Sequence, residues 1–296
     1  TVASVVCPMR VARNDYHQRD NPMNLDQLKA KLEQMPTPDK RGLYSQIDKD
    51  KVEQAVADIF QAGPEAWTLL IDQIVEPTVG GDHSARYALH VLGLHISKLH
   101  DAEARKKFTA ALARPLGGAK PKPVQAYLAQ ELWYFGLPDA LAVLANLLDD
   151  AELCDPAAMA MMAHEGQAAP FFRQALPQAK GKCRRMIVQC LGRLRDAQSA
   201  GEIAKSAGDE DVEMRQVAVW ALANIGQPSA ADAVLKAAQT PEGWERTHAA
   251  KCCLLLAERL VAAGRKDDAA RLTTYLKESR TDKSEKYIAE AAGRIK

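Results

Sequence analysis

The chain has 296 residues, of which 47% are hydrophobic and 26% charged, a balance typical of globular proteins and unlike that of disordered chains. Its 39 basic and 38 acidic residues leave a formal net charge of +1, so the sequence lacks the basic excess of proteins that neutralise many phosphates. This balance argues against wholesale nucleic-acid binding, and the absence of a long apolar run argues against a membrane span.

The first 22 residues show no helical periodicity, and we expect residues 1–22 to form a largely disordered extension. Residues 1–7 are too short and too weakly apolar for an intact signal peptide. A chain that begins at Thr1 without methionine is also compatible with a signal peptide already removed, and this remains the alternative to a cytoplasmic localisation.

A helix and a polar connector are predicted for residues 23–48, because apolar residues recur at helical spacing up to Pro36. A helical hairpin is predicted to follow over residues 49–75, with its turn at Gly63-Pro64. Glycine commonly ends a helix and proline commonly begins one. We interpret this hairpin as a degenerate first repeat.

Six segments of the chain superimpose at spacings of 29 to 31 residues, with one longer step of 40. We mark the last residue of each aligned stretch, which gives Gly93, Trp133, Ala163, Gly192, Ala223 and Leu254. The positions one, four and five residues before each mark are apolar in every segment, and these offsets share one helical face. A period near 30 with one apolar stripe per unit indicates a helical repeat array.

Each repeat is predicted to have a first helix that ends at the mark, a short turn and a second helix. The second helices are expected near residues 101–113, 138–149, 168–176, 197–207, 228–239 and 265–278. The long step contains residues 114–123, whose Pro, Gly and Lys content predicts an exposed loop. We therefore expect a solenoid over residues 49–282, capped by a short helix in residues 283–296.

One segment matches a known repeat pattern most fully. Residues 211–226 read Asp-Val-Glu-Met-Arg-Gln-Val-Ala-Val-Trp-Ala-Leu-Ala-Asn-Ile-Gly, and residues 183–196 and 84–93 match less fully. The pattern resembles the HEAT-repeat family in its short form of about 30 residues, which is shared with the phycobilisome-lyase-like repeats. The resemblance implies an all-α, armadillo-like fold, a right-handed α-α superhelix (α-solenoid) of about seven helical hairpins. It says little about function, because such repeats occur in scaffolds, adaptors, lyases and a few enzymes.

Tryptophans are the first candidates for partner contact. Trp220 stands three residues before its mark, in a mostly polar column, so we expect it to be exposed and to bind a partner unless a neighbouring side chain covers it. Under this hypothesis Trp220→Ala leaves folding nearly intact but weakens partner binding. Trp133 and Tyr134 end a helix where other repeats have Gly or Ala, and they either fill a gap or project into a groove. Trp67 and Trp244 begin helices and are interpreted as packing residues.

Arginines form a second group of candidates. Arg184, Arg215 and Arg246 are spaced by 31 residues, eight before their marks, at the start of the apolar stripe. We favour a structural role in which each guanidinium meets an acidic residue of a neighbouring turn, over a basic ladder that grips an acidic ligand. Arg185 stands seven before its mark, a position expected to face solvent, and forms a local basic patch with Lys180, Lys182 and Arg184.

The six cysteines include no C-x-x-C pair, and two pairs of them recur in register, as Cys154 with Cys183 and Cys190 with Cys252. We interpret them as small apolar core residues in a reducing compartment, which favours the cytoplasm. The sequence has no H-E-x-x-H motif and no clustered histidines or cysteines at metal-ligand spacing. We therefore predict no catalytic residue, no metal and no cofactor.

The function we favour is a non-catalytic scaffold or adaptor, not an enzyme, that binds another protein through an extended curved surface. Two alternatives stay open. An accessory lyase-like or small-ligand-binding HEAT protein would have a pocket joining titratable side chains of neighbouring second helices. A nucleic-acid-binding solenoid would use the basic patch around Arg185 and the loop at 114–122, with strongly salt-dependent binding.

Overall fold

The computed structural model describes residues 23–44 and 47–296, and within them the chain forms helices joined by turns and loops. No strand is present in this part of the chain, so the predicted all-α fold class is confirmed. The predicted extension at residues 1–22 lies outside the described residues. The described residues divide into two compact units, one up to residue 101 and one over residues 102–296, and the proposed solenoid at 49–282 stays a prediction.

The first unit holds four α-helices among its described residues. They are α1 (Leu25–Leu32), α2 (Lys49–Gln61), α3 (Pro64–Asp72) and α4 (His83–Leu99). Helix α1 begins with a capping box, in which the side chains of Asn24 and Gln27 each accept a hydrogen bond of 2.9 Å from the other residue's backbone N–H. The predicted turn at Gly63-Pro64 is confirmed, since Gly63 has a φ of 83° and Pro64 is the first residue of α3.

Trp67 is the packing residue of this hairpin, as predicted. Its side chain is 2% exposed, and its Nε1–H donates a hydrogen bond of 3.2 Å to the carbonyl oxygen of Ile59. Its ring stacks on Phe60 with centroids 6.0 Å apart. The indole therefore fixes α3 against the end of α2.

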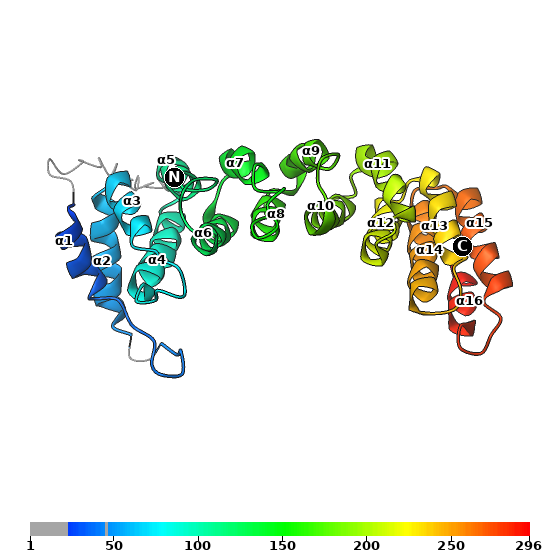
Figure 1. The fold of residues 1–296 in the computed structure, drawn as a ribbon, viewed down its shortest axis with the longest axis horizontal. Coiled ribbons are helices and arrows are strands. Elements are labelled where there is room, and N and C mark those ends of the chain that lie inside the picture. The colour runs from blue at the N-terminus through cyan, green and yellow to red at the C-terminus, as the bar shows by residue number, and fades with distance from the viewer. Residues whose placement is uncertain (1–22, 45–46) are drawn as a thin grey trace, which may run out of the picture. The chain divides into compact units, whose positions relative to one another are not determined.

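The second unit contains α5 (Ala102–Ala113), α6 (Lys122–Phe135), α7 (Leu141–Ala145), α8 (Cys154–Met162), α9 (Glu165–Ala175), α10 (Gly181–Arg193), α11 (Ala200–Lys205), α12 (Val212–Ile225), α13 (Ala231–Ala238), α14 (Trp244–Ala262), α15 (Lys266–Ser279) and α16 (Lys286–Ala292). Figure 1 shows α6, α8, α10 and α12 in one row, and α5, α7, α9 and α11 in another. The first row, continued by α14, consists of the predicted first helices, and each packs on the next.

Three of the predicted second helices are interrupted. Those at 138–149, 197–207 and 228–239 each begin with a 3₁₀ turn, which are η1 (Pro138–Ala140), η2 (Ala197–Ser199) and η4 (Pro228–Ala230), and a further turn, η3 (Ser206–Gly208), follows α11. Both η1 and η4 begin with proline. Proline has no backbone N–H to donate and a fixed φ, so it is well accommodated in the first turn of a helix, which is often of the 3₁₀ type. The second helices are consequently shorter than their sequence pattern suggests.

The predicted apolar stripe is buried in α6, α10, α12 and α14, as it is in α4. Helix α8 is the exception, because it buries Ala157, Ala158 and Met161 while Met159 is 48% exposed. The register mark of this repeat is therefore Met162, and the predicted mark Ala163 is wrong by one residue. The cause is composition, since alanines and methionines fill this helix and two adjacent registers look equally apolar.

Helices α10 and α12 approach each other at Gly192. A Cβ atom on Gly192 would lie 2.7 Å from the Cβ and 2.8 Å from the Cα of Ala221. The Nδ2–H of Asn224 donates a hydrogen bond of 2.8 Å to the carbonyl oxygen of Gly192 across the same contact. The absence of a side chain at Gly192 is thus what allows these two first helices to pack backbone to backbone.

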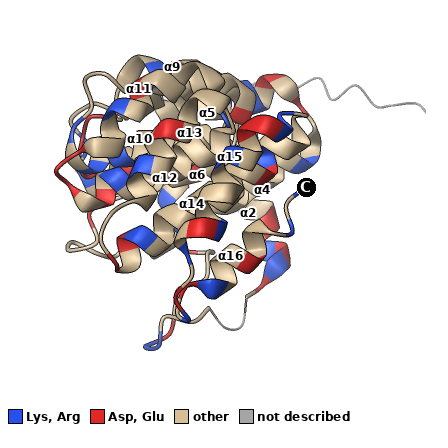
Figure 2. Ribbon diagram, turned by 90° about the vertical axis from the view of Figure 1, so that its right-hand side faces the viewer, with Lys and Arg blue, Asp and Glu red and all other residues tan. Residues whose placement is uncertain are grey.

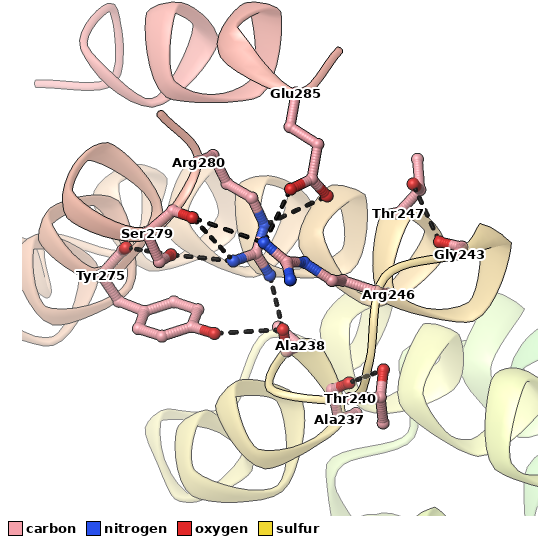
Figure 3. Close-up of polar contacts among 10 residues, drawn as sticks. All are labelled: Ala237, Ala238, Thr240, Gly243, Arg246, Thr247, Tyr275, Ser279, Arg280 and Glu285. Carbon is pink, nitrogen blue, oxygen red and sulfur yellow. Dashed lines mark hydrogen bonds and ion pairs between the residues drawn. The ribbon is translucent and has the colours of Figure 1, made fainter. Parts of the chain in front are cut away.

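A buried arginine organises the C-terminal end (Figure 3). Arg280 is 1% exposed, and it donates hydrogen bonds to the carbonyl oxygen of Ala238 and to the Ser279 hydroxyl, the latter at 2.9 Å. The Glu285 carboxylate lies 3.6 Å from the Nε of Arg280 and 2.7 Å from a guanidinium nitrogen of Arg246. This cluster links α13, α14 and α15 to the segment that leads into α16.

Candidate functional site

The solvent side of the first helices forms a regular surface in the second unit. With the mark of α8 corrected to Met162, the position ten before each mark is exposed in all five repeats, although in the α8 repeat it precedes the helix, and the position seven before is half-buried in all five. The position three before is exposed in four of them and half-buried in α12. We call these positions on α6, α8, α10, α12 and α14 the first-helix face.

Trp133 and Tyr134 lie at the end of α6, beside this face. They are 40% and 50% exposed, and their rings contact each other with centroids 4.8 Å apart. Of the two roles that the sequence left open, these side chains therefore show the exposed one. They form an apolar surface instead of filling an interior gap.

Trp220 lies on the first-helix face but is only half-exposed. Its ring atom Cζ3 would be 2.9 Å from a Cβ on Gly192, so the ring lies against α10. The neighbouring helix thus covers part of the indole, which is the alternative that the sequence analysis named. The rest of the indole lies on the same face as Met159 of α8, because both residues stand three before their marks.

Arg185 also lies on this face, at the position seven before the mark. Its guanidinium is 2.6 Å from a carboxylate oxygen of Asp211 and 3.2 Å from one of Glu213. These ion pairs connect α10 to the start of α12. Arg185 therefore already has acidic partners within the chain.

The ladder of three arginines serves the structure, as we favoured. Each guanidinium contacts a carboxylate from a neighbouring element, and the pairs are Arg184 with Glu202 at 3.4 Å, Arg215 with Glu245 at 2.7 Å and Arg246 with Glu285 at 2.7 Å. The hydrogen bond from Arg215 lowers the pKa of Glu245. The ladder therefore ties successive repeats together.

The basic patch considered for nucleic acid is largely neutralised within the chain. Lys182 pairs with Asp155, and Lys122 lies 2.9 Å from Asp150 and 3.0 Å from Glu152. Figure 2 shows basic and acidic segments interspersed over the helices from α9 to α15. This arrangement does not favour a continuous phosphate-binding stripe.

Two exposed apolar residues of this surface were missed or misread in the sequence. Trp244 is 66% exposed, so its predicted role as a packing residue is wrong, and Met159 was placed in the buried stripe. Trp244 stands ten before its mark, where the other repeats have residues such as Lys182 and Glu213. The polar character of that column was the signal that would have predicted its exposure.

The cysteines contribute no reactive group to this surface. The five that the structure describes are free and buried, and burial raises the pKa of Cys190, Cys252 and Cys253 to about 12. Within residues 23–44 and 47–296, no three His, Cys, Asp or Glu side chains are placed to hold a metal ion. Nor is any helix of these residues long and apolar enough to span a membrane.

We compared the chain with known protein families and solved structures. A crystal structure of an engineered protein aligns over 91% of this chain and 77% of its own, with 17% identity and a TM-score of 0.46. The complex of CpcE and CpcF of phycocyanin lyase from Nostoc sp. PCC7120 aligns over 79% of this chain and 95% of its own, with 17% identity and a TM-score of 0.39. No curated protein matches the sequence. The family model of HEAT repeats matches residues 169–254, from α9 into α14, so the predicted resemblance to HEAT repeats is confirmed for this part of the chain.

Proposed function

We propose that the chain is a non-catalytic scaffold that binds another protein through the first-helix face of its second unit. The observation behind the proposal is a set of large apolar side chains exposed on or beside this face, which are Trp133, Tyr134, Met159 and Trp244. Tryptophan, tyrosine and methionine are enriched in protein interfaces, and interface affinity is concentrated in a few such residues. Exposed apolar patches on a folded surface commonly mark such contacts.

The charged residues of the same surface support this role over catalysis. Arg185, Lys182 and Lys122 are held in ion pairs, so the surface presents apolar anchors among compensated charges. This is the composition of a protein interface, with apolar anchors and a polar surround. The buried free cysteines support a reducing compartment, and we propose the cytoplasm.

The test is an affinity capture from native lysate with three forms of the full chain. One is the natural sequence, one has Trp133→Ala with Tyr134→Ala, and one has Tyr287→Ala as a matched control on α16. Tyr287 is 51% exposed but lies outside the first-helix face. We expect one near-stoichiometric protein that resists nuclease, falls at least about tenfold with the double variant and is unchanged with the control.

Two outcomes would contradict the proposal. Equal recovery of that protein with the double variant would remove the α6 anchors from the interface. Recovery that depends on intact nucleic acid would shift the function to a nucleic-acid-binding solenoid.

A further inference from the structure

We propose that the pocket between the second helices α11 and α13 binds a carboxylate carried on an apolar or aromatic body. The pocket has a volume of about 490 Å³, within the range of small-ligand sites. Its walls come from α11 with η3, from α13 and from the first halves of α12 and α14. The polar side chains that line it include Lys205, Arg215, Gln216, Lys236, Glu245 and His248.

The charge of the lining favours an anion. Lys205, Arg215 and Lys236 are cationic, and Glu245 is the one carboxylate among the lining residues. Arg215 and Glu245 pair with each other at 2.7 Å, and Lys205 pairs with Glu202 at 2.6 Å. Lys236 has no ion pair among the residues that the structure describes. The pocket therefore keeps an uncompensated positive charge.

Gln216 supplies a hydrogen-bond donor without an acceptor. Its side-chain nitrogen is shielded from solvent and has no partner in the described part of the chain. Its backbone carbonyl oxygen accepts a hydrogen bond of 3.2 Å from the Nε2 of His248, which fixes this turn of α12. Buried donors are normally satisfied, and an entering carboxylate oxygen would supply the missing acceptor.

Trp244 provides an aromatic surface beside the pocket. Its ring lies edge-on to the ring of the pocket-lining His248, with centroids 6.3 Å apart, and the indole is 66% exposed. A solvent-exposed indole next to a cationic pocket suits a ligand whose carboxylate enters the pocket while its apolar body covers the ring. This combination defines the chemical class that we propose.

A second groove between successive second helices of the same unit provides an internal comparison. The groove between α7 and α9 has a volume of about 460 Å³, and it is lined by uncharged residues together with Asp149. It has no Lys or Arg in its lining. Repeat packing alone therefore produces the hollow, whereas the positive charge belongs specifically to the groove between α11 and α13.

This inference shares Trp244 and Gln216 with the first-helix face, but its experiment measures the binding of small probes to the pocket, so its failure is distinguishable from a failure of the proposed function. The carboxylate has two possible sources, a free organic acid or an acidic side chain of a peptide. Phenylpropionate represents the first, and the peptide acetyl-Gly-Glu-Phe-Gly-amide represents the second. Their uncharged counterparts are phenylpropionamide and the same peptide with glutamine in place of glutamate.

The experiment titrates each probe into the full chain by calorimetry. We expect at least one carboxylate probe to bind about tenfold or more tightly than its amide, as expected for a charge-assisted contact. Lys236→Ala and Gln216→Leu should each weaken that binding about fivefold. The matched control is Lys277→Ala, an exposed lysine of α15 outside the pocket, which should change binding less than about twofold.

The outcomes separate the sources and can overturn the inference. Tighter binding of phenylpropionate assigns the site to free carboxylates, and tighter binding of the peptide assigns it to acidic segments of a partner. The proposal would be overturned if each acid bound no more tightly than its amide, or if neither acid bound. It would also be overturned if neither Lys236→Ala nor Gln216→Leu weakened binding. Unchanged melting curves of the variants exclude unfolding as the cause of a loss.

Discussion

The starts of α3 and α14 place a tryptophan in similar sequence surroundings but in opposite environments. Trp67 comes four residues after Gly63 and is 2% exposed, whereas Trp244 directly follows Gly243 and is 66% exposed. Trp67 has a preceding helix that receives it, where Phe60 stacks on its ring. Trp244 occupies a position that is exposed in every repeat of its unit. Position in the repeat, rather than nearness to a helix start, therefore decides burial.

The substitution Trp67→Ala tests the buried side of this comparison and should have the largest effect. Removing a buried indole should lower the free energy of unfolding by about 3–5 kcal/mol. The lost hydrogen bond to the carbonyl oxygen of Ile59 adds to the cost of the cavity. Urea unfolding followed by circular dichroism measures the change. A loss no greater than that of Trp244→Ala would break the comparison.

Arginines extend the same comparison to charged residues. Arg280→Ala leaves the buried Glu285 with Arg246 as its remaining ion-pair partner and removes the donor to the carbonyl oxygen of Ala238. Breaking a buried pair costs about 3–5 kcal/mol, and the remaining partner should place this variant at the low end. Hydrogen exchange should show faster opening of α15 and α16.

The control for that substitution is Arg265→Ala. Arg265 is exposed and pairs with Asp268 within the first turn of α15, where solvent screens the interaction. We expect little change in unfolding for this variant. Equal destabilisation by the two substitutions would mean that the burial of Arg280 has no energetic consequence.

Two glycine-to-alanine substitutions should change the free energy of unfolding in opposite directions. Gly192→Ala places a methyl group against the backbone of Ala221, so α10 and α12 must separate, at a cost of about 1–3 kcal/mol. Gly201→Ala on α11 meets nothing within 4 Å and should stabilise the helix by about 0.5–1 kcal/mol. Thermal unfolding of both variants gives the comparison, and destabilisation by Gly201→Ala would contradict it.

The repeat period, the helix order and the buried stripe were predictable because they depend on spacing within one helix. The register of α8 was not, since alanine and methionine make two faces equally apolar. The ion-pair partners of Arg185 could not be predicted from the sequence either, because Asp211 and Glu213 approach it from another helix. The same limit applies to the pocket between α11 and α13, whose lining comes from four parts of the chain.

Trp244→Ala should have the smallest effect on stability and so gives the exposed side of the comparison. Substitutions of exposed residues without structural contacts usually change the free energy of unfolding by less than about 0.5 kcal/mol. The contact with the His248 ring is the one ring contact that the indole makes within its unit, and it lies at the surface. If the indole is a binding surface, the variant should melt like the natural chain while phenylpropionate or the peptide binds more weakly. Destabilisation comparable to that of Trp67→Ala would show that the indole packs in solution and would remove it from both proposed binding surfaces.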